Sequence, residues 1–283
     1  MKSLVIFFLS LLLLMPFLGF AQDEWVFAED NIDSRPLPMD VFKAGDTVQL
    51  FGENVRLRQA PNTNSETLTM LAITDSVKVL KRTDSLLAYE GRNFYWYQVK
   101  WQDKTGYISD AFFARVVLKN RFGKDFYFRH HFDDKLGSEV SIRVQKGNKM
   151  VDKITLSPSG SNIEVHVMDD QGLKNLDNII VLDYSSEACG ENGGLSYIFL
   201  NNEKLYHVAD LSSIGDGGVL HEDESFTFPI KRHNNSSDRI IYNQEHGKEK
   251  ADGDYYWYQT VQNRKELTWT GKELLPKNYK TIE

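Results

Sequence analysis

Short runs of alternating apolar and polar residues dominate the chain from Asp46 to Ser109. Turn residues such as glycine, proline and asparagine separate the runs, and no segment shows the apolar spacing of an amphipathic helix of ordinary length. Because alternate side chains of a strand point to opposite faces, this pattern predicts a small β-barrel or sandwich. The predicted strands are Asp46–Gly52, Val55–Arg58, Thr67–Ile73, Ser76–Arg82, Tyr95–Trp101 and Gly106–Ser109.

The alternation also predicts which side chains form the interior. On the strand that ends at Trp101, the odd-numbered residues are apolar and should face the core, which leaves Trp96, Gln98 and Lys100 on the outer face. Arg56 and Arg58 are outward by the same argument. The predicted core consists of five residues: Val55, Leu57, Val79, Tyr97 and Val99.

Two stretches of this region carry a family resemblance. The run V-R-L-R-Q-A-P-N-T-N-S (Val55–Ser65) resembles the opening signature of the bacterial SH3 domain (SH3b), and W-Y-Q-V-K-W-Q-D-K-T-G-Y-I (Trp96–Ile108) resembles its closing hairpin. The resemblance covers residues 45–114. Arg56 departs from the asparagine that is usual in the family, and Thr83–Asn93 is longer than the usual connection. The resemblance implies a module that recognises cell-wall material, often peptidoglycan peptides, or that supports a neighbouring domain.

The outward residues of the barrel form the predicted ligand site. An exposed tryptophan beside cations suits a glycan ring or a peptide carboxylate. The alternative is that Trp96 packs against the rest of the chain or against Thr83–Asn93, because large aromatic residues are buried on average. The candidate ligand-binding residues are Trp96, Tyr107, Arg56, Arg58 and Lys100.

Residues 117–283 predict a second β-rich domain, a sandwich or an open barrel, which resembles no family that we recognise. Leu195–Leu200 is apolar on both faces and should be a central strand, and Asn201-Asn202-Glu203 should form a tight hairpin turn.

Two segments are predicted to be irregular. Residues 22–44, which precede the barrel, contain two prolines and show no periodic spacing of apolar residues, which predicts a mostly irregular arm. His233–Asp254 is polar and predicts a long exposed loop. The fold class is therefore all-β.

The beginning of the chain predicts export. Residues 1–21 combine Lys2, an apolar run and small residues before Gln22, the pattern of a cleaved signal peptide, and no later segment has a membrane-spanning length. The formal charge of −7 argues against a nucleic-acid partner. With one cysteine no internal disulfide can form, so packed cores must stabilise a periplasmic or extracellular protein.

A cell-wall hydrolase or cysteine peptidase is the alternative function. The nucleophile would be Cys189, with His207 or His221 as its base. Residues around Cys189 lack the hydrolase pattern, and the acidic and histidine runs near His130 and His221 lack the spacing of a zinc site. We therefore expect no metal and no cofactor, and a non-enzymatic protein that binds peptidoglycan or an envelope protein.

Overall fold

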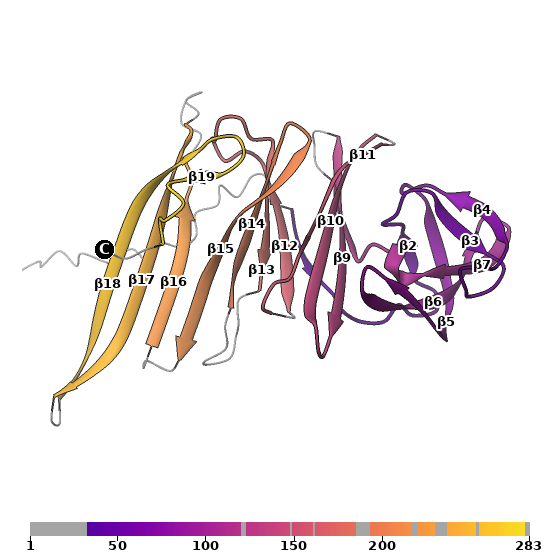
Figure 1. Cartoon of the computed structure of the whole chain (residues 1–283), viewed down its shortest axis with the longest axis horizontal. Helices are drawn as coiled ribbons and strands as arrows, with labels where there is room; N and C mark the ends of the chain where they lie inside the picture. Colours follow the sequence, from indigo (N-terminus) through magenta and orange to yellow (C-terminus); the bar gives the residue numbers. More distant parts are fainter. Residues whose placement is uncertain are drawn as a thin grey trace, which may run out of the picture.

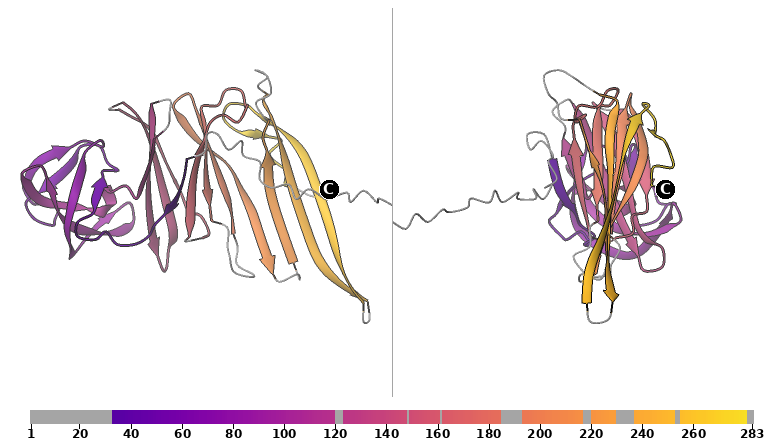
Figure 2. Two further views of the ribbon diagram at one scale, coloured as in Figure 1. Left: turned by 180° about the vertical axis from the view of Figure 1, so that it is seen from behind. Right: turned by 90° about the vertical axis from the view of Figure 1, so that its left-hand side faces the viewer.

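The structure is a computed structural model that describes residues 33–119, 123–147, 149–160, 162–184, 193–216, 220–229, 237–252 and 255–280. The predicted all-β class is confirmed: the described residues form strands in three sheets, with a short 3-10 turn at Asp110–Phe112 and no α-helix. No described helix has the length and apolar character needed to cross a membrane. The molecule is elongated, with a small barrel at one end (Figures 1 and 2).

The barrel is a six-stranded antiparallel sheet in the order β2-β5-β6-β7-β3-β4. All five predicted core residues are buried, which confirms that alternate side chains of these strands face the barrel interior. Two links close the barrel, because Leu50 bridges to Phe113 and the Phe51 amide donates to the Phe112 carbonyl at 2.7 Å. The strands are β2 (Thr47–Gln49), β3 (Val55–Arg58), β4 (Thr67–Leu71), β5 (Ser76–Tyr89), β6 (Arg92–Trp101) and β7 (Lys104–Ser109).

The long connection predicted at Thr83–Asn93 is ordered as the outer half of the β5–β6 hairpin. Leu86 pairs with Tyr95 and Tyr89 with Arg92, and the turn residues Glu90 and Gly91 have φ angles of 50° and 79°. Positive φ at both central positions is the geometry of a two-residue hairpin turn. The segment is therefore an extension of the barrel strands and not a loop.

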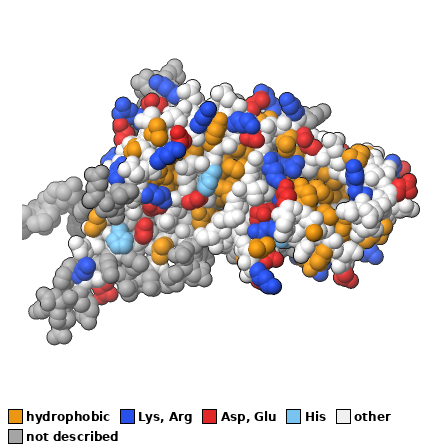
Figure 3. All heavy atoms as spheres, viewed as in Figure 1, with side chains coloured by type: hydrophobic (Ala, Val, Ile, Leu, Met, Phe, Trp, Pro, Cys, Tyr) orange, Lys and Arg blue, Asp and Glu red, His pale blue; other side chains and the backbone are white. Residues whose placement is uncertain are grey.

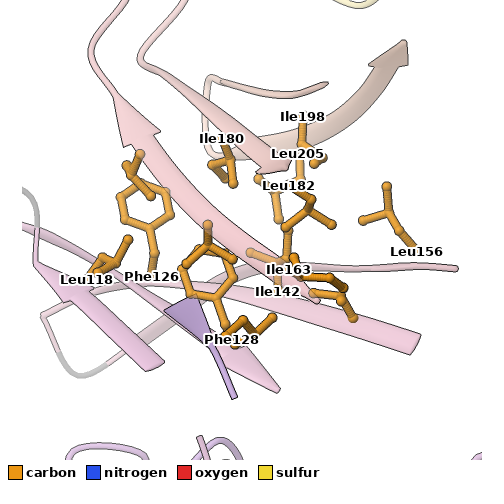
Figure 4. Packing of buried hydrophobic residues seen from close by; sticks show 14 of the residues in the cluster. Leu118, Phe126, Phe128, Ile142, Leu156, Ile163, Ile180, Leu182, Ile198 and Leu205 are labelled. Carbon is orange, nitrogen blue, oxygen red and sulfur yellow. The ribbon is translucent and has the colours of Figure 1, made fainter. Parts of the chain in front are cut away.

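A four-stranded sheet, in the order β11-β10-β9-β8, follows the barrel along the chain. It packs against one face of a nine-stranded sheet, and their facing apolar side chains form a shared core that includes Phe126, Phe128, Ile142, Ile180 and Leu182 (Figure 4). This packing makes the predicted sandwich. The strands of the smaller sheet are β8 (Val116–Lys119), β9 (Lys124–Asp133), β10 (Gly137–Lys146) and β11 (Lys149–Leu156).

The nine-stranded sheet runs in the order β1-β12-β13-β14-β15-β16-β17-β18-β19. Its β14 is buried at every position, because Ile198 faces the shared core while Tyr197 and Phe199 face a second core on the opposite side of the sheet. The predicted central strand is thus confirmed. The strands are β1 (Asp33–Leu37), β12 (Ile163–Met168), β13 (Asn178–Asp183), β14 (Gly193–Asn201), β15 (Lys204–Asp216), β16 (Leu220–Thr227), β17 (Arg239–Asp252), β18 (Tyr255–Trp269) and β19 (Leu274–Leu275).

The hairpin turn predicted after β14 is also confirmed. Asn201 pairs with Lys204, and the residues between them, Asn202 and Glu203, have φ angles of 47° and 63°. Asparagine adopts positive φ more readily than most residues, which explains why the sequence signal was reliable here.

Two predictions of irregular structure were wrong in part. Residues 33–37 of the predicted arm form β1, an edge strand that pairs with β12, and an edge strand tolerates Pro36 because one of its sides needs no amide donor. Much of the predicted loop His233–Asp254 is β17, whose ladder with β18 projects beyond the neighbouring strands (Figure 1). In the projecting part of this ladder no described residue of β17 packs into a core. The residues of β17 there are therefore polar on both faces and show no alternation of apolar and polar side chains.

Candidate functional site

Cross-strand pairing defines the outer face of the barrel. Residues directly opposite each other in an antiparallel pair lie on the same face of the sheet. One such row crosses β5, β6, β7 and β3 and consists of Lys81, Gln98, Tyr107 and Arg58. The adjacent row contains Lys78, Lys100 and Thr105. The predicted ligand residues Tyr107, Arg58 and Lys100 therefore share this face.

The predicted residues differ in how accessible they are. Arg56 and Lys100 are exposed and Tyr107 is half-buried. Arg58 is only 9% exposed, and its Nη1 donates to the Ser65 carbonyl at 2.7 Å, so this guanidinium holds the loop between β3 and β4. Its role in the structure is to order that loop.

The ligand-binding role expected for Trp96 was wrong, and its burial agrees with the alternative that it packs against the rest of the chain. Its exposure is 3%, and Phe94, two residues earlier and on the same face of β6, is also 3% exposed and contacts the His131 ring with centroids 4.5 Å apart. His131 belongs to β9. The four-stranded sheet thus covers the part of the outer face of β6 around Phe94. Alternation showed that Trp96 points away from the barrel interior, but it could not show that another sheet packs there.

Four cations remain open on this face of the barrel. Arg56, Lys78, Lys81 and Lys100 are exposed, and none of them forms a salt bridge with a described residue. The predicted ligand residues do not include Lys78 and Lys81, although the alternation along β5 directs Lys78 outward. We call Arg56, Lys78, Lys81, Lys100 and Tyr107 the cationic face.

The cationic face is a local feature. On the visible side of the whole molecule, Lys and Arg side chains are interspersed with Asp and Glu side chains (Figure 3). Exposed lysine and arginine side chains on one face can bind carboxylate or phosphate groups by donating charge-assisted hydrogen bonds to them. Such a face lacks the continuous basic surface that a nucleic-acid duplex needs.

A buried polar network joins the tip of the β5–β6 hairpin to the four-stranded sheet. The Arg129 guanidinium on β9 donates to the Ala111 carbonyl at 3.0 Å, to Glu90 Oε2 at 3.0 Å and to Glu139 Oε1 at 3.1 Å. Arg92, near the tip of the β5–β6 hairpin, donates to the second oxygen of Glu139 at 2.9 Å. Burial alone would raise the pKa of Glu90, but hydrogen bonds from Lys153, at 2.7 Å, and from Arg129 hold that pKa below its usual value.

The residues considered for catalysis or metal binding are dispersed. His130 and His131 are adjacent on β9 and point to different surroundings: His130 contacts Leu37 and Ser138, whereas His131 contacts Phe94. Within the described part of the chain, no group of three His, Cys, Asp or Glu side chains could hold a metal ion. Cys189 lies outside the described residues, as does the predicted signal peptide.

The fold and the position of its cationic face define the N-terminal part as a small SH3-like barrel. Residues 53–114 match the family model of the bacterial SH3 domain, so the family predicted for this region is confirmed. This domain type is a cell-wall-binding module. This family match covers under a quarter of the chain. Comparison of the chain with curated proteins and with solved structures gave no match.

Proposed function

We propose that the protein is an exported, non-enzymatic binding protein whose SH3 barrel recognises negatively charged cell-wall material, the carboxylates of peptidoglycan peptides in particular. The observation that carries the proposal is the cationic face, because four exposed cations with no salt-bridge partner among the described residues share one outer face of a bacterial SH3 domain with Tyr107. Carboxylates on a flexible peptide can pair with several of these cations at once. The pattern of residues 1–21 supports export.

The proposal is tested by sedimentation of purified sacculi with the chain from residue 22 onward. Replacing Lys78, Lys81 and Lys100 by Gln should weaken binding by roughly tenfold, since each exposed ion pair contributes up to about 1 kcal/mol. The matched control replaces Lys119, Lys135 and Lys272, which are exposed elsewhere, by Gln. Added salt should weaken binding of the unmodified chain as well.

Unchanged sedimentation of the triple variant would contradict recognition through the cationic face. If the unmodified chain fails to bind sacculi, a protein of the envelope becomes the better candidate partner. The non-enzymatic part of the proposal is measured separately, by release of soluble fragments from the same sacculi. Release that disappears in Cys189→Ala would favour the cell-wall hydrolase.

A further inference from the structure

A pocket of about 610 Å³ opens where the shared core of the two sheets ends. Leu156 and Tyr184 belong both to that core and to the pocket wall. The remaining walls come from the segment after β11, with Ser157, Pro158 and Ser159, and from β14 and β15. A volume of this size accommodates a small molecule.

Four polar side chains from three parts of the sheet converge in this pocket. The Ser196 hydroxyl donates to Asp210 Oδ1 at 2.6 Å, and His207 Nε2 lies 2.8 Å from the same oxygen. Because the Ser196 hydrogen is used in this way, the Tyr184 hydroxyl, 3.2 Å away, must donate to Ser196. Asp210 Oδ2 takes no hydrogen bond from a described residue, and 58% of the Asp210 side chain is exposed.

Two glycines set the position of Tyr184. A Cβ at Gly194 would lie 2.3 Å from the Leu211 carbonyl oxygen and 3.1 Å from Tyr184 Cε2, and a Cβ at Gly160 would lie 2.9 Å from Tyr184 Cβ. Both positions therefore require glycine if the ring is to keep this place. Gly160 packs closely against the Cβ of Tyr184 and Gly194 against one edge of its ring, an arrangement that orders the polar group before any ligand enters.

The arrangement suits recognition and not hydrolysis. In a hydrolytic triad the imidazole lies between the carboxylate and the nucleophilic hydroxyl, so that it can take the hydroxyl proton. Here the carboxylate of Asp210 lies between Ser196 and His207. Ser196 is also 2% exposed, so a substrate has little access to its hydroxyl.

The charge of the pocket indicates an uncharged ligand. No lysine or arginine is among the described residues that line it, so an anion would meet the Asp210 carboxylate. A cation would find a single carboxylate among the described lining residues, and its Oδ1 already bonds to Ser196 and His207. A purely apolar ligand would leave the hydroxyl, imidazole and carboxylate groups without partners.

We propose that this pocket binds a single neutral sugar ring, with Asp210 and His207 bonded to ring hydroxyls and with Leu156, Pro158 and Tyr184 against the apolar parts of the ring. A ring with several hydroxyls both donates and accepts hydrogen bonds, which matches a wall containing a carboxylate, an imidazole and several hydroxyls. The site is separate from the cationic face and does not depend on it.

The test uses saturation-transfer NMR on the chain from residue 22 with glucose, galactose, mannose and N-acetylglucosamine, each added alone. We expect at least one sugar to bind and Asp210→Asn to weaken that binding about tenfold, the effect of losing a hydrogen bond to a charged group. Ser159→Trp, which adds bulk at an exposed position of the wall, should abolish it. Asp134→Asn, an exposed carboxylate of the β9–β10 turn, is the matched control and should bind as the unmodified chain does.

Two results would overturn the proposal: no transfer to any of the sugars, or equal binding by Asp210→Asn, Ser159→Trp and the unmodified chain. Because two different variants remove the site, misfolding of one leaves the other informative. The Lys78, Lys81 and Lys100 variant should retain sugar binding, so failure of the cell-wall proposal and failure of this one are distinguishable.

Discussion

His130 lies on β9 with its imidazole buried and a partner at each ring nitrogen. Nδ1 is 3.3 Å from the Leu37 carbonyl oxygen, to which it donates, and Nε2 is 3.2 Å from the Ser138 hydroxyl, from which it accepts. Burial lowers the pKa of His130 to about 4, so the ring is neutral at physiological pH. This one side chain connects β1 to the four-stranded sheet.

The His130 environment predicts a pH dependence of stability. Between pH 6.5 and about 4 the unfolded chain binds a proton at this position that the folded chain does not bind, so acidification destabilises the fold. His130→Gln keeps a donor and an acceptor but does not titrate. Urea unfolding at pH 7 and pH 4.5 should show that the variant loses less stability than the unmodified chain, by roughly 2 kcal/mol. Equal losses would contradict the assignment of this effect to His130.

Asp110 supplies a control of opposite sign. Burial raises its pKa to about 6, and its buried Oδ1 has no hydrogen-bond partner among the residues that the structure describes. Between about pH 4 and pH 6 the folded chain holds a proton that the unfolded chain has lost, so this group favours folding at low pH. Asp110→Asn should therefore make the loss of stability on acidification steeper, whereas His130→Gln makes it shallower.

At the scale of elements, β1 has a larger role than its five residues indicate. It forms one edge of the nine-stranded sheet by pairing along β12, and its Leu37 is 3% exposed in the shared core. The Leu37 carbonyl is also the partner of His130. Without β1, the edge of β12 and part of that core would be open to water.

We predict that a chain beginning at residue 38 is about 3 kcal/mol less stable than a chain beginning at residue 33. The loss corresponds to the burial of Leu37 and the hydrogen bonds of the β1–β12 pair. The comparison requires urea unfolding of both chains in the same buffer. Stabilities that agree within 0.5 kcal/mol, on the order of a single surface substitution, would show that β1 contributes little.

At the scale of the whole molecule, the barrel is inserted between two parts of one larger body. The chain forms β1 in the nine-stranded sheet, continues through the barrel, and returns at β8 to the four-stranded sheet. Insertion of this kind requires the two ends of the inserted unit to be close. They are close here, because the Ala114 amide donates to the Gln49 carbonyl at 2.9 Å.

Arg129 is the residue on which the contact between barrel and sheet most depends. It is 2% exposed, and its guanidinium carbon is 5.1 Å from the centroid of Phe94 and 5.3 Å from that of Phe51, in addition to its hydrogen bonds. These contacts join the barrel to the four-stranded sheet through one buried side chain.

Arg129→Met should destabilise the protein by about 3 kcal/mol, because Glu139 stays largely buried after losing one of its two cations. The control is Arg82→Met, an exposed arginine of the same barrel that lies over the Tyr95 ring at 4.4 Å, which should cost less than about 1 kcal/mol. Urea unfolding followed by tryptophan fluorescence measures both. Similar effects of the two substitutions would mean that the buried network does not hold the units together.

Part of this architecture could be predicted because its causes are local. Alternation identified the five core residues of the barrel, and asparagine at positive φ identified the turn at Asn202. The cationic face could be predicted only in part, since Arg56 and Lys100 are outward by parity while Lys81 depends on a register shift after Val79. The pocket could not be predicted, because Tyr184, Ser196 and Asp210 are brought together only when three neighbouring strands pair in a particular register.

By itself, the sequence determined that the chain is all-β, that an SH3 barrel stands near its beginning and that Leu195–Leu200 is buried on both faces. These properties follow from the period of two, which is set by the geometry of a single strand. The tertiary structure decided that Trp96 is covered, that β1 completes a distant sheet and that Arg129 joins the two units. Each of these depends on contacts between residues far apart in the chain, which no local pattern encodes.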